Sequence, residues 1–177
     1  MDQSLRLKTI DEKLRYETHN NDVFDKRYQN FVSPITSAIL ENFSKDHTGL
    51  DFGAGTGPVI SKILGDNDFK IKQYDPFFHK NEKLLHKKYD YIACCEVMEH
   101  FYSPKKDFSL LKNVLLKGGR LYCMTDIYDE SIDFSLWYYK NDPTHVFIYQ
   151  KETIAWIKNE LQFSDVNIEG RLITFFN

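Results

Sequence analysis

The sequence predicts one α/β domain with a mostly parallel sheet, helices on both faces of the sheet and an antiparallel hairpin at one edge. Three observations support this prediction. The chain has 177 residues, and a single domain averages about 150. After residue 47, short apolar stretches alternate with stretches of helical periodicity, as they do in β-α-β units. The last two apolar stretches, 166–168 and 172–176, flank Glu169-Gly170 in the manner of a hairpin.

Composition and charge exclude several classes of protein. A chain that is 42% hydrophobic and 28% charged is neither disordered nor of low complexity. Its net charge of −3, without a basic block, gives no reason to expect a nucleic-acid partner. No stretch approaches the roughly 18 apolar residues of a membrane span, and charges throughout residues 1–15 exclude a secretory signal. Three cysteines, two of them adjacent, cannot form a disulfide framework, so we expect a reduced, cytoplasmic protein.

Residues 1–47 are predicted to form a helical arm ahead of the sheet. Residues 48–177 form the sheet and its helices, and we expect the two parts to make one structural domain. Six side chains in the arm recur at helical spacing and are expected to pack: Tyr28, Phe31, Val32, Ile35, Ile39 and Phe43.

The first β-α-β unit begins with a strand at 48–52. Pro58 suits the start of the next helix, because proline lacks the N–H group that would have no partner there. Gly65 is predicted to end this helix. Residues 69–74 alternate between apolar and polar as a half-buried strand does, and Asp75-Pro76 ends that strand.

The second half of the chain continues the alternation. Residues 89–95 are predicted to form a third strand, in which 91–95 are a continuous apolar run typical of a buried parallel strand. Ser103-Pro104 is predicted to begin a helix that Gly118-Gly119 closes. A strand at 120–125 follows, and the last helix, after Lys151, has an apolar face made of Ile154, Ile157 and Leu161.

The turn at residues 51–57 (DFGAGTG) is rich in glycine and joins a strand to a helix. Ligands of open α/β sheets bind at this edge, and glycines let backbone N–H groups approach a ligand closely. A dinucleotide fingerprint needs a third glycine where Pro58 stands, and the carboxylate of Asp51 does not favour a pyrophosphate. The turn therefore suits a ligand with a positive group and no phosphate.

The stretch LDFGAGTGPVI resembles the first motif of the class I S-adenosylmethionine (SAM)-dependent methyltransferases, whose fold is Rossmann-like. Four later features fall where that family places its own, and one of them is the terminal hairpin, which completes the family's sheet. Asp75 resembles the carboxylate that accepts both ribose hydroxyls, and residues 89–96 resemble the strand beside the methionine half of SAM. Residues 115–121 resemble the family's L-x-P-G-G stretch, with Lys117 in place of the proline. The resemblance covers about residues 28–176 and implies SAM as the cofactor of a SAM-binding domain at 48–177.

The resemblance also implies which residues bind SAM. The segment between Asp75 and Tyr89 is too short for a helix, a strand and a second helix, so we expect the family's third strand to be vestigial, around Leu84-Leu85. No acidic residue matches the family's contact to the adenine amine. The implied cofactor-binding residues are Asp51, Gly53, Ala54, Gly55, Gly57, Asp75, Pro76, Cys95 and Glu96.

Methyl transfer needs a nucleophile held in line with the methyl group, and a hydroxyl nucleophile must also lose a proton. If the chain turns helically after Glu96, then Glu96, Glu99 and His100 lie on one face. His145 follows in a later loop on the same side of the sheet. His100 and His145 are the predicted catalytic residues, which deprotonate or orient the acceptor. Two carboxylates and two imidazoles also suit a divalent metal ion.

The E-V-M-E-H stretch with the later T-H resembles two metal-assisted branches of the family, the ubiquinone-pathway O-methyltransferases and the small-RNA 3′-terminal 2′-O-methyltransferases. In those enzymes, residues matching Glu96, Glu99, His100 and His145 bind a Mg²⁺-type ion that grips substrate hydroxyls. Two imidazoles favour Mn²⁺, Co²⁺ or Zn²⁺ over Mg²⁺. Other members carry a similar stretch without a metal, so both interpretations stay open.

The sequence therefore predicts a SAM-dependent methyltransferase that acts on a small-molecule acceptor at oxygen, with Mg²⁺ or Mn²⁺ assistance left open. Two alternatives are an RNA ribose 2′-O-methyltransferase, against which the net charge weighs, and a non-catalytic SAM-binding partner subunit, against which the intact first motif weighs. The chain ends just after the last predicted strand, so we expect no appended substrate domain. The oligomeric state is left open.

Two further segments have two interpretations each. Residues 15–20 either close over the cofactor as a lid, as N-terminal helices do in this family, or form a solvated turn. The aromatic residues between the fourth strand and His145 either pack in the core or line a site for a small planar or apolar acceptor. These aromatic residues are Phe134, Trp137, Tyr138 and Tyr139.

Overall fold

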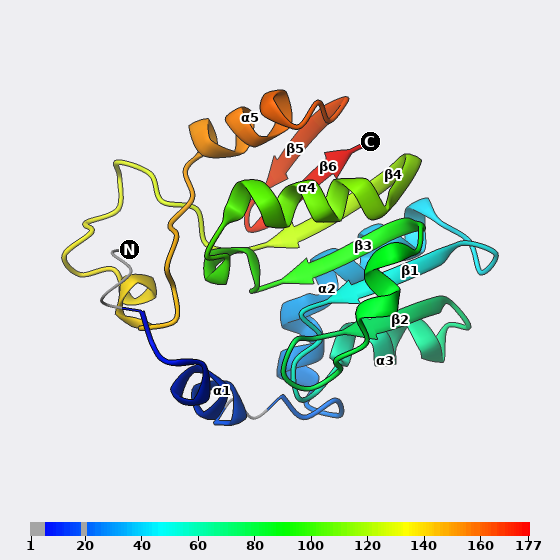
Figure 1. Ribbon diagram of the computed structural model, residues 1–177, viewed down its shortest axis with the longest axis horizontal. Coiled ribbons are helices and arrows are strands. Elements are labelled where there is room, and N and C mark those ends of the chain that lie inside the picture. The colour runs from blue at the N-terminus through cyan, green and yellow to red at the C-terminus, as the bar shows by residue number, and fades with distance from the viewer. Residues whose placement is uncertain (1–5, 19–20) are drawn as a thin grey trace.

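The computed structural model describes residues 6–18 and 21–177, and it contains one six-stranded sheet in the order β2-β1-β3-β4-β6-β5 (Figure 1). Strands β1 to β4 run parallel, β6 pairs antiparallel with β4, and β5 completes a hairpin with β6. The predicted α/β class and its edge hairpin are confirmed. The strands are β1 (Thr48–Phe52), β2 (Lys70–Tyr74), β3 (Tyr89–Cys95), β4 (Leu115–Met124), β5 (Asp165–Glu169) and β6 (Leu172–Phe176).

Helices cover both faces of the sheet. In Figure 1, α4 (Pro104–Val114) crosses in front of the sheet and α2 (Lys26–Asn42) behind it. Helix α5 (Lys151–Glu160) packs on the face of α4, and α3 (Val59–Asp66) packs beside α2. Helix α1 (Thr9–Glu17) lies beyond the carboxyl ends of the parallel strands (Figure 1). Within the described residues, no helix is long and apolar enough to cross a membrane.

Two apolar cores, one on each face, hold these layers together. Side chains of β3 alternate between them: Ile92 and Cys94 pack with α4 and α5, while Tyr91 and Ala93 pack with α2 and α3. A strand segment whose two faces are both buried must be apolar, which explains the unbroken apolar run at 91–95. Of the six side chains expected to pack, Val32, Ile35 and Ile39 are buried, and Tyr28, Phe31 and Phe43 are partly buried against the same core.

Two predicted boundaries are wrong. Helix α4 ends at Val114, before Gly118-Gly119, because Leu115 already pairs with Tyr89 at the start of β4. The two glycines lie inside β4, where the register with β3 shifts and Gly118 has a φ of 79°. Gly65 lies within α3, and the left-handed residue that follows the helix is Asp68, with a φ of 64°.

The connection from β2 to β3 contains no strand among the described residues. It forms a single 3₁₀ turn, η2 (Glu82–His86), whose buried Leu84 packs into the core. The predicted shortening of this region is therefore confirmed, and it leaves β2 as an edge strand of the sheet.

Candidate active site

The glycine turn after β1 has a backbone that side chains would disturb. Gly53 and Gly55 have positive φ values of 79° and 62°, a region that glycine adopts freely. A Cβ atom at Gly53 would lie 2.3 Å from Cγ2 of Val97, so the turn packs directly on the segment after β3. The N–H groups of Gly53 and Ala54 donate to the carbonyl of Tyr74 at 2.8 and 3.2 Å, which joins the turn to β2.

Two buried carboxylates border the turn. Asp75 Oδ2 accepts from the N–H of Gly55 at 3.0 Å, while its Oδ1 accepts from the N–H groups of Phe77 and Phe78. Asp51 is 4% exposed and accepts from the Ser61 hydroxyl at 2.7 Å, and burial raises its pKa to about 6. The structure thus brings together Asp51, the glycines and Asp75, as predicted for a cofactor site; Pro76 follows Asp75 directly and is exposed.

The segment before α2 covers the same turn. A Cβ atom at Gly57 would lie 1.6 Å from the backbone oxygen of Asn21, so only glycine allows this approach. Sequence reasoning missed Asn21, which has no recognisable motif. Of the predicted lid segment 15–20, Arg15 forms an ion pair with Asp142 at 2.8 Å. His19 and Asn20 lie outside the described residues.

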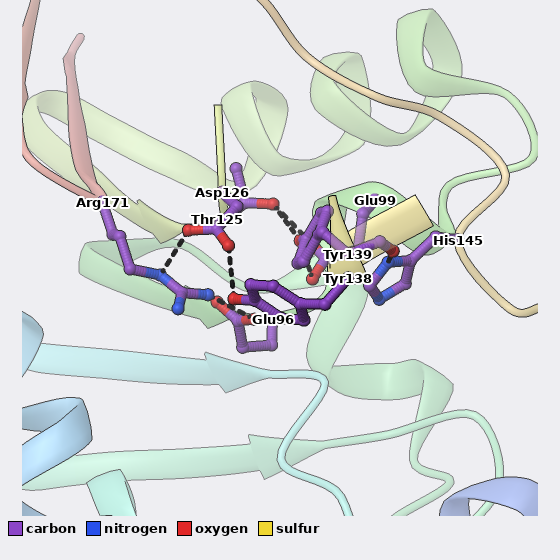
Figure 2. A network of polar contacts seen from close by, with 8 residues as sticks. All are labelled: Glu96, Glu99, Thr125, Asp126, Tyr138, Tyr139, His145 and Arg171. Atoms are coloured by element: carbon purple, nitrogen blue, oxygen red, sulfur yellow. Dashed lines mark hydrogen bonds and ion pairs between the residues drawn. The ribbon is translucent and has the colours of Figure 1, made fainter. Parts of the chain in front are cut away.

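Glu96 does not lie with Glu99 and His100 as expected. Its φ is 51°, and the chain then forms a short 3₁₀ turn, η3 (Met98–His100), instead of an α-helix. The Glu96 carboxylate therefore turns toward the β5–β6 hairpin, where Nη2 of Arg171 donates to Oε2 at 2.7 Å (Figure 2). Arg171 Nε also lies 3.2 Å from Oδ1 of Asp126.

The position of Glu96 suits its predicted role in cofactor binding better than its predicted role as a metal ligand. Its second oxygen, Oε1, is buried and has no hydrogen-bond partner within residues 6–18 and 21–177. Burial, together with the nearby charge of Glu99, raises the pKa of Glu96 to about 8 in spite of Arg171. An unpaired buried carboxylate oxygen favours a ligand that donates a hydrogen bond. Cys95, just before it, is a partly buried strand residue whose pKa burial raises.

Glu99 is completely buried and held by two hydroxyl groups. Oε1 accepts from the Tyr139 phenol at 2.7 Å, and Oε2 accepts from the Thr125 hydroxyl at 3.2 Å (Figure 2). The two hydroxyl oxygens also lie 2.6 Å apart. Burial raises the pKa of Glu99 to about 7, although both hydrogen bonds oppose that rise.

His100 and His145 share one arrangement. Nδ1 of His100 lies 2.9 Å from the carbonyl of Thr144, and Nδ1 of His145 lies 2.7 Å from the carbonyl of Tyr139. A carbonyl only accepts, so each Nδ1 carries the proton and each Nε2 keeps a free lone pair in the neutral ring. Burial lowers the pKa of both imidazoles, which favours that neutral form.

The two rings and Glu99 converge. The ring centroids are 5.0 Å apart, and ligand atoms of Glu99, His100 and His145 all lie within 4.8 Å of one another. One carboxylate and two neutral imidazoles are a donor set that binds divalent transition metals. Three of the four predicted ligands are thus brought together, and Glu96 is not among them.

A cavity of about 440 Å³ opens beside this cluster, with His145 in its wall. Tyr138 and Tyr139 contribute to the lining as the acceptor-site interpretation requires, while Trp137 packs against Tyr139 and Phe134 is 45% exposed. Sequence reasoning missed Arg171, which lies in a hairpin turn without a motif. The cavity is lined by Arg15, Phe31, Glu96, Tyr138, Tyr139, Asn141, Asp142, His145 and Arg171.

Comparison with known proteins identifies the fold. The chain is similar in structure to a SAM-dependent methyltransferase from Archaeoglobus fulgidus, with a TM-score of 0.63, 19% identity and coverage of 80% of this chain and 72% of that one. It also resembles an O-methyltransferase family protein from Burkholderia thailandensis, with a TM-score of 0.59, 11% identity and coverage of 94% of this chain and 66% of that one. A third structural neighbour is human N-acetylserotonin methyltransferase in complex with SAM, with a TM-score of 0.60, 11% identity and coverage of 84% of this chain. The match covers 53% of that protein, so the chain spans about half of its length.

Sequence comparison supplies the family. No curated protein matches the chain. A family model described as a methyltransferase domain matches residues 24–168, which is most of the chain. That range includes the glycine turn, Asp75, the Glu99–His100–His145 cluster and the last helix. The chain therefore belongs to the methyltransferase-domain family and has the class I fold of the SAM-dependent methyltransferases.

Proposed function

We propose that this protein transfers the methyl group of SAM to a hydroxyl oxygen of a small planar acceptor, with a divalent cation held by Glu99, His100 and His145. The observation behind this proposal is the convergence of two neutral imidazoles and a buried carboxylate, of which His145 lies in the wall of the cavity. Phe31, Tyr138 and Tyr139 line the same cavity and favour a flat, partly apolar acceptor.

The residues around the glycine turn would hold the cofactor. The Asp75 carboxylate, already aligned by three backbone N–H groups, would accept hydrogen bonds from the ribose hydroxyls. Oε1 of Glu96 would accept from the ammonium group at the methionine end, which would supply the partner it lacks. Asn21 and the rest of the segment before α2 would cover the bound molecule.

The metal-binding residues fit a divalent ion on two counts. Each imidazole directs an unprotonated Nε2 away from a carbonyl that orients the ring, as metal-bound histidines usually do. Glu99 is oriented in the same way by Tyr139 and Thr125. A bound Mn²⁺ or Mg²⁺ would lower the pKa of an acceptor hydroxyl and favour its loss of a proton.

Side chains of the protein would then orient the acceptor and take up its hydroxyl proton. The acceptor oxygen forms its bond to the methyl carbon as the carbon–sulfur bond of SAM breaks, which leaves a neutral thioether. The hydroxyl proton leaves to a base, and His145 is the imidazole that reaches the cavity. Arg15 and Arg171 at the rim are each paired with a carboxylate, so the cavity presents no free excess of positive charge among its lining residues.

Calorimetric titration of Mn²⁺ and Mg²⁺ into protein saturated with S-adenosylhomocysteine tests the proposal. We expect about one equivalent of Mn²⁺ to bind, and His145→Ala to abolish this binding without loss of S-adenosylhomocysteine affinity. The exposed His86, changed to alanine, is the matched control and should behave as the wild type. Failure to bind S-adenosylhomocysteine would overturn the cofactor assignment. Cofactor binding without metal binding would overturn metal assistance and leave His145 as a direct base.

A further inference from the structure

A second hollow, of about 700 Å³, lies beside β2 and shares no lining residue with the cavity beside His145. Ile71, Lys72 and Gln73 all line it, although successive side chains of a strand point to opposite faces of a sheet. Three consecutive strand residues can share a groove only if it follows the edge of the strand. Strand β1 pairs along the other edge of β2, from Lys70 to Tyr74, so this groove follows the free edge.

Backbone polar groups on that edge lack partners. The Tyr74 carbonyl accepts from the turn after β1, and alternation along the strand then directs the N–H and C=O groups of Ile71 and Gln73 to the free edge. No described residue hydrogen-bonds to them there. The free edge can pair with an antiparallel segment, because Asp75, just beyond β2, exchanges two backbone hydrogen bonds with His79, at 3.3 and 3.2 Å.

The chain therefore begins a strand on this edge at His79 and then leaves it to form η2. The groove is the space that the rest of such a strand would fill. Nε2 of His79 is buried there and has no partner in the part of the chain that the structure describes. A strand seated in the groove would pair with both Ile71 and Gln73.

The groove is positively charged, which favours an acidic occupant. Lys72, Lys80 and Lys87 line it, and no acidic residue does. Among the described residues, only Lys80 of these three has a carboxylate partner, Glu82 at 3.7 Å. An extended segment that carries acidic side chains would pair with the lysines while its backbone completes the sheet.

We propose that the free edge of β2 binds an extended acidic segment of a partner polypeptide by strand addition. In this mode main-chain hydrogen bonds supply affinity and side-chain contacts supply specificity. Nucleic acid fits the lysines equally well, but its phosphates only accept hydrogen bonds and would leave the carbonyls of Ile71 and Gln73 unpaired. Lysines can also protect an exposed strand edge from aggregation. The test must therefore separate peptide binding, nucleic-acid binding and protection of the edge.

The first test is fluorescence anisotropy of a labelled peptide of alternating glutamate and valine, titrated with the intact chain at low ionic strength. We expect binding that weakens about tenfold in the Lys72→Glu/Lys87→Glu double variant, because each reversal replaces an attraction with a repulsion. Lys106→Glu/Lys117→Glu, at exposed lysines on α4 and in β4, is the charge-matched control and should bind as the wild type. A peptide of alternating lysine and valine should not bind.

Amide hydrogen exchange then tests strand addition itself. The amides of Ile71 and Gln73 should exchange more slowly in the complex, whereas those of Lys70 and Lys72, which face β1, should not change. Ile71→Pro removes an edge donor without breaking a β1 hydrogen bond and should abolish peptide binding while S-adenosylhomocysteine still binds.

Three results would overturn the proposal. One is peptide binding that leaves the exchange of Ile71 and Gln73 unchanged, which would mean contact through charge alone. Another is binding of an oligothymidylate through the same lysines when the peptide does not bind, which would assign the groove to nucleic acid. The third is no binding of either probe, which would leave Lys72 and Lys87 as guards of an exposed edge. None of these results depends on methyl transfer.

Discussion

The phenol of Tyr139 donates to the Glu99 carboxylate at 2.7 Å, and the backbone carbonyl of Tyr139 accepts from Nδ1 of His145 at 2.7 Å. Its ring also lies 4.1 Å from the His145 ring, centroid to centroid. One residue of η4 (Tyr138–Asn141) thus orients two of the three residues that converge beside the cavity.

Tyr139→Phe keeps the ring and the carbonyl but removes the hydroxyl that Glu99 and Thr125 share. We expect a loss of about 1–3 kcal/mol in the free energy of unfolding, because a buried carboxylate oxygen loses its donor. Mn²⁺ affinity should fall by about 10- to 100-fold, as it does when a partner of a metal ligand is removed. Tyr138→Phe is the control, since that side chain is 63% exposed. Unchanged Mn²⁺ affinity in Tyr139→Phe would contradict the orienting role.

Gly57→Ala should separate cofactor binding from general stability. The new methyl group would lie 1.6 Å from the backbone oxygen of Asn21, so the covering segment must move. We expect S-adenosylhomocysteine affinity, measured by calorimetry, to fall at least about tenfold. Gly65→Ala in α3 meets no atom within 4 Å and should stabilise the protein by up to about 1 kcal/mol without changing this affinity. Equal affinities in the two variants would show that Asn21 does not cover the site.

Asp51 should make stability depend on pH. Its pKa in the folded protein is about 6, above the ordinary 3.8, so the folded state binds more protons than the unfolded state between these values. The free energy of unfolding therefore falls as pH rises from about 4 to about 6, by up to about 3 kcal/mol, and this contribution is absent above that range. Asp51→Asn keeps an acceptor for Ser61 and should flatten the slope, measured by denaturant unfolding across this range. Parallel pH profiles for variant and wild type would refute the assignment.

The ion pair between Arg15 and Asp142 should hold α1 over the cavity. Both side chains are partly exposed, so we expect Arg15→Met to change the free energy of unfolding by less than about 1 kcal/mol. Amides of α1 should nevertheless exchange faster, and S-adenosylhomocysteine should dissociate more quickly. Glu17→Gln, which removes the exposed ion pair with Lys13 within α1 and leaves Lys13 over the Phe78 ring, is the matched control. If both variants exchange alike, Arg15 does not restrain a lid.

Local pattern determined most of the fold. The alternation in 69–74, the unbroken apolar run of 91–95 and the glycines at 53, 55 and 57 each reflect a local requirement of the structure at that position. Such requirements are met by neighbours in the sequence, so the strands, the glycine turn and the family could be identified without coordinates. The predicted end of helix α4 was wrong because pairing with a distant strand overrides the local helical pattern, as where Leu115 pairs with Tyr89.

Tertiary structure alone decided how the site is assembled. Glu96 and Arg171 are 75 positions apart in the sequence, and no motif marks their contact. The left-handed backbone at Glu96 separates it from Glu99, which a helical spacing rule cannot foresee. The partners of Glu99 and of both imidazoles come from the segment 125–145, and the open edge of β2 exists because η2 replaces a strand. The sequence by itself determined which chemical groups are present and which backbone elements carry them. Long-range packing decided which of those groups meet, because a side chain's partners depend on where the whole chain places them.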